Sequence, residues 1–181
     1  MEKENTDGLI AVKKVVISVA NESNLQPLIE GLLKYCPGVV IFTRDGNFAT
    51  IEKIFKASKK ENTGEVQLQY LTYRDAEAHD IDLVIINLNK FPDLNLPAQA
   101  VMDGVESFRF QFLFAMAQRF RHTMVVTSPD RYEWLINKLQ DNGGYMEYKD
   151  RLNGSLEPFR IIAEYSAQIL HYFQRKSMIT K

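Results

Sequence analysis

The sequence has few of the residues on which disulfide scaffolds and metal sites depend. Its 181 residues include one cysteine, Cys36, so no disulfide can form within the chain. The three histidines, His79, His122 and His171, lie far apart, and no cysteine–histidine spacing matches a zinc site. A disulfide-rich fold is excluded, and a zinc-binding module is not expected.

Neither an excess of charge nor a long apolar run is present. Lys and Arg number 22 against 23 Asp and Glu, so the chain has no basic surplus to attract nucleic acid or an anionic membrane. Met1–Gly8 lacks the apolar stretch of a signal peptide, and the most apolar segment, Phe108–Ala117, is short and contains Arg109. We expect no nucleic-acid or membrane partner, and a cytoplasmic location.

Short β-branched runs predict the strands of a parallel sheet. Continuous rather than alternating apolar residues are typical of strands that are covered on both faces. An alternating segment, Val66–Tyr70, fits an edge strand. The four continuous runs are Lys14–Ala20, Val39–Phe42, Leu83–Leu88 and Thr123–Thr127.

Helical patterns lie between these runs, and the alternation predicts an α/β fold with helices around an open sheet. Ser23 or Asn24 is a plausible cap for the first helix, Asn47 precedes the second, and Pro129 suits the first turn of the third. The four expected helices are Leu25–Leu33, Phe48–Phe55, Tyr132–Leu139 and Ser155–Gln174.

Four phenylalanines alternate strictly at 108, 110, 112 and 114, a spacing that by period alone indicates a strand. The strong helix formers Ala115–Gln118 follow directly, so we favour a helix. Such a helix must be buried on nearly all sides, against its own sheet and a partner subunit, which suggests a homodimer. A central core helix without a partner remains the alternative.

Ligands of open α/β sheets bind beyond the carboxyl ends of the strands, so the loops that follow the strands are candidate sites. The loop after the second run combines the Thr43 hydroxyl, Gly46 and a helix start at Asn47, which together can hold a phosphate. Arg44 would add a bidentate contact, whereas Asp45 would repel an anion. The alternative explanation is an Asp-Gly turn with a helix cap.

Five segments match the motifs of one known family, in order and with similar spacing. Ile17–Leu25 is similar to Ile-Ser-Val-Ser-Asp-Lys-Thr-Gly-Leu, and Ile81–Phe91 is similar to Ile-Asp-Leu-Val-Val-Val-Asn-Leu-Tyr-Pro-Phe. The others are Ile41–Asn47, Ser128–Tyr132 and Phe159–Phe173. On these motifs the sequence resembles the IMP cyclohydrolase domain of the bifunctional purine biosynthesis enzyme, which has the methylglyoxal-synthase-like fold.

The resemblance implies a Rossmann-like three-layer α/β/α sandwich with a mostly parallel central sheet, and a homodimer. We expect a single domain over residues 13–176, with flexible tails at 1–12 and 177–181. The formyltransferase domain of the family has no counterpart here, so a separate formyltransferase chain is an expected partner.

The resemblance also implies a purine ribotide as ligand and the closure of formyl-aminoimidazole carboxamide ribotide to IMP. This dehydrative cyclisation needs only proton transfer and charge stabilisation, so we expect no cofactor and no metal. The candidate catalytic residues are Glu106, which aligns with an aspartate of the family, and Lys90, a cation on the loop after the third apolar run. The candidate ligand-binding residues are Ser18, Asn21, Ser23, Thr43, Arg44, Gly46, Asn47, Asn87 and Asn89.

Several positions depart from the family pattern. The family's phosphate-side lysine is Glu22 here, a tyrosine is Asn89, and a lysine near the end of the following helix is Gln118. A Lys-Thr-Leu-His-Pro stretch has no counterpart. These changes favour an alternative function, a catalytically degenerate dimeric module for ligand binding or regulation. A further alternative is that the ligand is a small phosphorylated metabolite, as in methylglyoxal synthase, and that Asp45 is the catalytic carboxylate.

Overall fold

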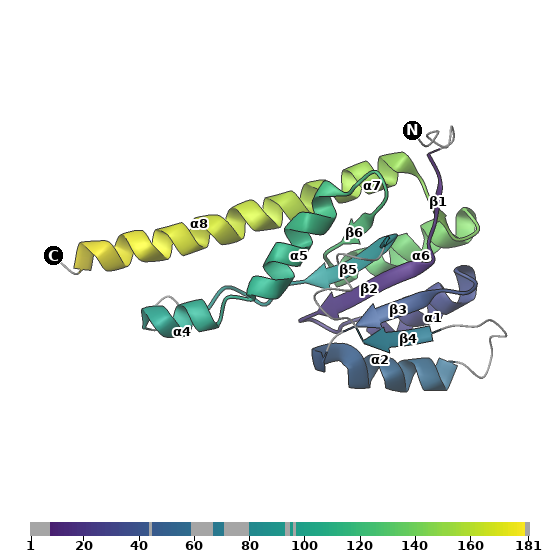
Figure 1. Cartoon of the computed structure of the whole chain (residues 1–181), viewed down its shortest axis with the longest axis horizontal. Helices are drawn as coiled ribbons and strands as arrows, with labels where there is room; N and C mark the ends of the chain where they lie inside the picture. The colour runs from purple at the N-terminus through teal and green to yellow at the C-terminus, as the bar shows by residue number, and fades with distance from the viewer. Residues whose placement is uncertain are drawn as a thin grey trace.

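The centre of the molecule is a five-stranded parallel sheet, in a computed structural model that describes residues 8–43, 45–58, 67–70, 80–92, 95 and 97–179 (Figure 1). All of its strand pairs are parallel, and their order is β4-β3-β2-β5-β6. Each of the four continuous apolar runs forms a strand, with ends within one residue of those predicted. The strands are β2 (Lys14–Val19), β3 (Val40–Thr43), β4 (Gln67–Tyr70), β5 (Leu83–Asn87) and β6 (Met124–Val126).

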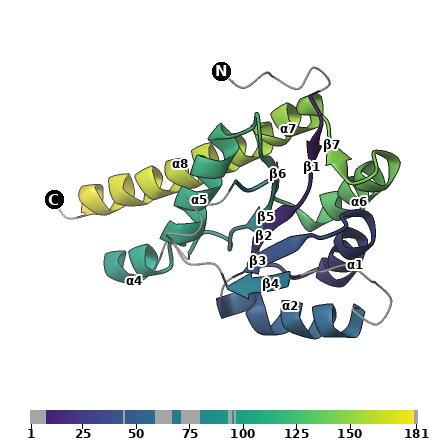
Figure 2. The ribbon, with the colours of Figure 1, turned by 45° about the vertical axis from the view of Figure 1, so that its right-hand side comes forward.

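Helices cover both faces of this sheet, so the predicted three-layer α/β/α sandwich is confirmed (Figures 1 and 2). One face packs against α1 (Leu25–Tyr35), α2 (Asp45–Ser58) and α6 (Tyr132–Asp141). The other face packs against α5 (Ser107–Gln118) and α8 (Leu156–Ile179). Successive strand residues therefore point into two different cores, which explains why the strands read as continuous apolar runs.

The strand order creates one switch point in the sheet. From β2 the chain moves outward to β3 and β4, then crosses to the other side of β2 and continues through β5 and β6. Loops that follow β2 and β5 consequently leave the sheet in opposite directions, and in open α/β sheets the crevice between such loops is where ligands bind.

The segment with four phenylalanines is helical, as predicted, and forms α5. It packs against β5, β6 and α8. Phe112 is buried, but Phe114 keeps 43% of its surface exposed, although its ring contacts that of Phe159 on α8 at a centroid distance of 6.1 Å. The expected burial on nearly all sides is therefore not reached within one chain, since Gln111, Phe114 and Ala115 of α5 are exposed.

Several short elements were not predicted. β1 (Ile10–Ala11) pairs antiparallel with β7 (Tyr145–Met146), so ordered pairing begins within the segment that we assigned to a flexible tail. At the other end α8 continues to Ile179, and no helix that the structure describes is both long and apolar enough to cross a membrane. The remaining short elements are α4 (Ala98–Asp103), α7 (Tyr148–Gly154) and the 3-10 helix η2 (Pro129–Arg131), which places Pro129 before α6 rather than in its first turn.

Two adjacent glycines turn the chain between α6 and β7, and both have positive φ, +61° at Gly143 and +88° at Gly144. A Cβ atom at Gly144 would lie 2.5 Å from the backbone oxygen of Tyr35. At Gly143 a Cβ atom would meet no described atom within 4 Å. Gly144 is therefore needed for both its conformation and its close contact with the end of α1, and Gly143 for its conformation alone.

We predict that Gly144→Ala lowers the free energy of unfolding by about 1–3 kcal/mol more than Gly143→Ala, since only the first forces a side chain against rigid backbone. Urea denaturation followed by circular dichroism measures both variants against the unmodified chain. Equal losses in the two variants would show that the close approach to Tyr35 does not constrain the fold.

Candidate functional site

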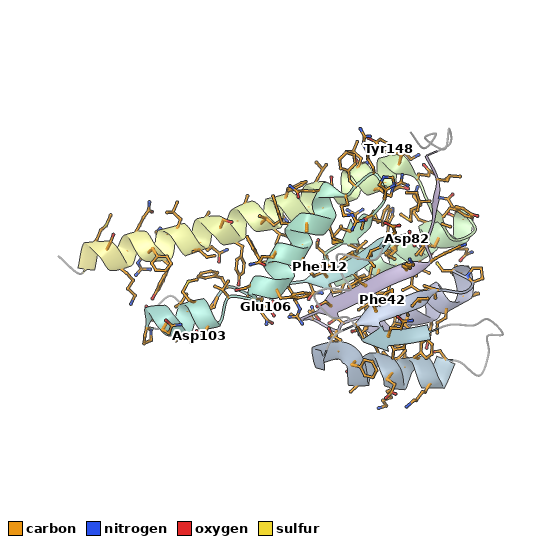
Figure 3. All side chains as sticks on the ribbon, viewed as in Figure 1. Phe42, Asp82, Asp103, Glu106, Phe112 and Tyr148 are labelled. Atoms are coloured by element: carbon orange, nitrogen blue, oxygen red, sulfur yellow. The ribbon has the colours of Figure 1, made fainter. Side chains whose placement is uncertain are left out.

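Polar side chains from several loops meet at the carboxyl edge of β2 and β5, where Figure 3 shows Glu106 at the start of α5. Asp82, at the opposite edge of the sheet in the same view, accepts hydrogen bonds from the backbone N–H groups of Lys13 and Lys14. The matched segments, far apart in the sequence, thus bring their polar residues to one end of the sheet.

Asn47 joins the start of α2 to the end of β2. The helix begins at Asp45, so Asn47 lies inside its first turn, and the prediction that it precedes the helix was wrong. Its buried amide oxygen accepts from Val19 N at 2.9 Å, and its amide nitrogen donates to Val19 O at 2.9 Å and to Glu22 Oε1 at 2.8 Å. These contacts show a positioning role for Asn47.

Asn87 holds the loop that follows β2. Its Oδ1 accepts from the backbone N–H groups of Ala20 and Asn21 at 2.8 and 2.7 Å, and its Nδ2 donates to Asn21 O at 3.3 Å. Thr43 is also engaged, since its hydroxyl donates to Ile17 O at 2.9 Å. The polar atoms of these buried residues therefore shape the loops of the crevice.

Glu106 and Arg109 form an ion pair across the switch point. Glu106 accepts from Asn89 N at 2.8 Å and from Asn89 Nδ2 at 2.9 Å, and its Oε1 pairs with Arg109 Nη1. Arg109 in turn donates through Nε to Ser18 Oγ at 3.1 Å and through Nη2 to Val19 O at 3.3 Å. Both side chains are largely buried, so the pair fixes the start of α5 to the end of β2 and to the loop after β5.

The sequence interpretation missed Arg109 as a site residue and treated it only as a charge that interrupts an apolar segment. The available signal was its position three residues after Glu106, the spacing at which opposite charges on a helix meet. A lone arginine among phenylalanines, on a helix that must face a core, also needs a buried partner. Together these two features could have paired Arg109 with Glu106.

Glu22, which stands where the family has a lysine, has a structural role here. Its carboxylate accepts from Asn47 Nδ2 at 2.8 Å and from Thr50 Oγ1 at 3.2 Å, both on α2. A carboxylate at the N-terminal end of a helix is also favoured by the helix dipole. The charge reversal therefore stabilises the start of α2.

Other predicted residues are less tied into the crevice. Lys90 is exposed and makes no hydrogen bond or ion pair with another described residue. Ser23 is exposed, and its backbone N–H donates to Asn21 Oδ1 at 2.9 Å. Gly46 lies in the first turn of α2, which shows that Asp45 and Gly46 begin a helix instead of forming the alternative Asp-Gly turn. Arg44 and the side chain of Asp45 lie outside the described residues.

Two buried groups have strongly shifted pKa values. Burial raises the pKa of the Tyr132 phenol to about 12, an effect that the nearby Asn87 side chain partly offsets, so Tyr132 stays neutral beside the crevice. Burial raises the pKa of the Cys36 thiol to about 12 as well, which leaves this cysteine unreactive at neutral pH.

No group of three His, Cys, Asp or Glu that could hold a metal ion occurs among the residues that the structure describes.

Comparisons with known proteins point to one family. The family model described as "AICARFT/IMPCHase bienzyme" matches residues 116–181. The bifunctional purine biosynthesis protein PurH of Synechocystis is 33% identical over 107 residues, which cover 55% of this chain and 20% of that protein. PurH of Ligilactobacillus salivarius is 23% identical over 194 residues, covering 92% of this chain and 38% of that protein. The chain thus spans a fifth to two fifths of the length of these relatives.

Among solved structures, the one titled "Crystal structure of ForH" superposes with a TM-score of 0.69 and 20% identity, covering 90% of this chain and 97% of that one. At this identity the match shows the fold alone, and that fold is the methylglyoxal-synthase-like α/β sandwich expected from the sequence. The resemblance to the IMP cyclohydrolase domain of the bifunctional purine biosynthesis enzymes is confirmed. Over the matched segments the chain is similar to that domain, and its sequence diverges from it at several motif positions.

We predict that Asn47→Ala lowers the free energy of unfolding by about 2–3 kcal/mol, because the buried Val19 N–H loses its acceptor. Asn137→Ala, which removes the same group from the exposed side of α6, should change it by less than about 0.5 kcal/mol. Urea denaturation without any ligand measures both variants. Similar small effects in the two would contradict the positioning role of Asn47.

Proposed function

We propose that this chain binds a purine ribotide at the carboxyl edge of β2 and β5 and closes formyl-aminoimidazole carboxamide ribotide to IMP. One observation carries the proposal. Three segments that match the cyclohydrolase motifs, Ile17–Leu25, Ile41–Asn47 and Ile81–Phe91, are far apart in the sequence, yet their polar side chains meet at the switch point of the sheet. Glu106 and Arg109 join them there.

The phosphate end of the ligand is expected at the start of α2. The first N–H groups of an α-helix have no acceptor within it, and the dipole favours an anion there. Gly46 leaves this backbone open to close approach. Thr43 would contribute little as a donor, since its hydroxyl hydrogen is directed to Ile17 O. Arg44, which follows β3 directly, remains a proposed contact.

Ring closure joins the carboxamide nitrogen to the formyl carbon. The formyl carbon gains a bond to the carboxamide nitrogen and a double bond to the formylamino nitrogen, and its bonds to oxygen break to release water. The two protons of that water come from these two nitrogens, one from each. In this proposal Glu106 accepts the proton from the carboxamide nitrogen, and Lys90, on the loop after β5, donates toward the oxygen and is reprotonated by the proton from the formylamino nitrogen. Asn89 would hold the Glu106 carboxylate in place through its two hydrogen bonds.

A second candidate is a ligand-binding or regulatory module without turnover. The observation that favours it concerns Asn89, which stands where the family has a tyrosine. The side-chain amide of Asn89 donates to Glu106, and the Glu106 carboxylate also pairs with Arg109. Gln118, where the family has a lysine, is the last residue of α5, about 16 Å along the helix from Ser107. Binding without product would distinguish this module from the enzyme.

We predict IMP formation from the formylated ribotide well above the uncatalysed rate, and a loss on the order of 10²-fold or more in Glu106→Gln. Glu157→Gln is the matched control, because Glu157 also pairs with an arginine three residues later on a helix but lies on α8. Chromatographic product assays measure all three proteins. A background rate with IMP still bound would favour the module, and a background rate without IMP binding would reject the purine ribotide as the ligand.

We also propose a homodimer that is formed through α8 and α5. Large apolar side chains remain exposed along these helices, and α8 extends well beyond the sheet (Figures 1 and 2). The exposed side chains on α5 and α8 are Phe114, Leu156, Phe159, Leu170, Phe173 and Met178.

A separate formyltransferase chain is proposed as a further partner, since the formylated substrate must come from a formyl-transfer reaction. The proposed location is the cytoplasm.

We predict that the chain sediments as a dimer and that Leu170→Glu shifts it to the monomer, since Leu170 is 60% exposed and would place a charge in the interface. Gln168→Glu adds the same charge at an exposed polar position of α8 and should leave the dimer intact. Analytical ultracentrifugation at several concentrations gives the result. A monomeric unmodified chain would contradict the proposed dimer.

A further inference from the structure

We infer that Arg109 is the anion-binding residue of the crevice and receives the phosphate monoester of the ligand. This inference rests on the proposed function for the identity of the ligand, but its phosphate-binding part can be tested without a purine. Arg109 lies outside the segments whose motifs match the family, and no ligand role was expected for it.

The position of the guanidinium supports this role. The side chain starts on the first turn of α5 and reaches the end of β2, where Nε donates to Ser18 Oγ at 3.1 Å and Nη2 to Val19 O at 3.3 Å. Its Nη2 atom also lies 3.9 Å from where a Cβ atom would stand at Gly46. Arg109 therefore bridges the ends of β2 and α2 at the crevice that the strand order predicts.

The guanidinium has donors to spare. An arginine side chain carries five N–H groups in a planar fork that matches a phosphate or carboxylate. Three of them have partners among the described residues, namely Ser18, Glu106 and Val19. Each Nη atom keeps one further N–H, so a phosphate can be bound in addition to Glu106 or in exchange for it.

Arg109 also lowers the negative charge of the crevice. Glu22 and Glu106 contribute two negative charges there, and Arg109 contributes the one positive charge with a described contact inside the crevice. The guanidinium thus halves the net charge of these groups and weakens the repulsion that a phosphate monoester would meet from the two carboxylates. Arg109 thus supplies the cation that is lost where Glu22 replaces the family's lysine.

A purely structural role is the competing explanation, in which Arg109 only joins α5 to β2. In that case Arg109→Gln would lower stability and leave the affinity of the folded protein for anions unchanged. A role in anion binding instead predicts a loss that depends on the phosphate group of the ligand and is partly rescued by lysine, which keeps the charge but not the fork.

The experiment compares IMP, inosine and inorganic phosphate as probes of the full-length chain, by isothermal titration calorimetry and by phosphorus NMR. The variants are Arg109→Gln, Arg109→Lys and the control Arg160→Gln, which removes an arginine with the same spacing from its glutamate on α8. We expect Arg109→Gln to weaken IMP and phosphate on the order of 10–100-fold and to leave inosine unchanged. Arg109→Lys should fall between, and Arg160→Gln should match the unmodified chain.

The outcomes separate this inference from the proposed function. Phosphate binding that depends on Arg109, without IMP binding, would support the inference and reject the purine ribotide as ligand. Unchanged affinity for phosphate and IMP in a folded Arg109→Gln or Arg109→Lys variant would overturn it. Failure of the unmodified chain to bind either phosphate-bearing probe would also overturn it.

Discussion

Parallel strands that are covered on both faces can present polar groups only at their ends, and this constraint organises the whole molecule. Helices bury both faces of β2 and β5, so the polar residues that follow these strands collect at one edge. There each buried polar atom must find a partner. Asn47 and Asn87 satisfy the backbone of the loops, and the Glu106–Arg109 pair connects α5 to the same edge.

The crevice is consequently organised before any ligand arrives. Backbone groups hold Asn47 and Asn87, and Arg109 holds Glu106. In the proposed function a ligand would therefore meet donors and acceptors that are already fixed, so little conformational entropy is lost on binding. The same bonds restrict chemistry, because Glu106 must exchange the hydrogen bonds it already has in order to move a proton. In the proposed function, binding would use this arrangement as it stands, whereas turnover would need a rearrangement of the Glu106–Arg109 pair.

The sequence was most informative where a single physical signal dominated. Continuous β-branched runs identified the strands to within one residue, and the helix formers after Phe114 decided the structure of α5 correctly. It was least informative where tertiary contacts decide. The pairing of Ile10–Ala11 with β7 depends on a strand 135 residues later, and the role of Arg109 depends on how α5 meets β2. Neither contact leaves a periodic signal in the sequence.

The most direct test of this account is a crystal structure of the chain with IMP bound. The account predicts that the nucleotide lies at the carboxyl edge of β2 and β5, with its phosphate against the Arg109 guanidinium and the first turn of α2, and with its base toward Asn89 and Glu106. IMP bound elsewhere, for example in the cleft of about 570 Å³ that Asn24, Pro27 and Tyr132 line between α1 and α6, would contradict it.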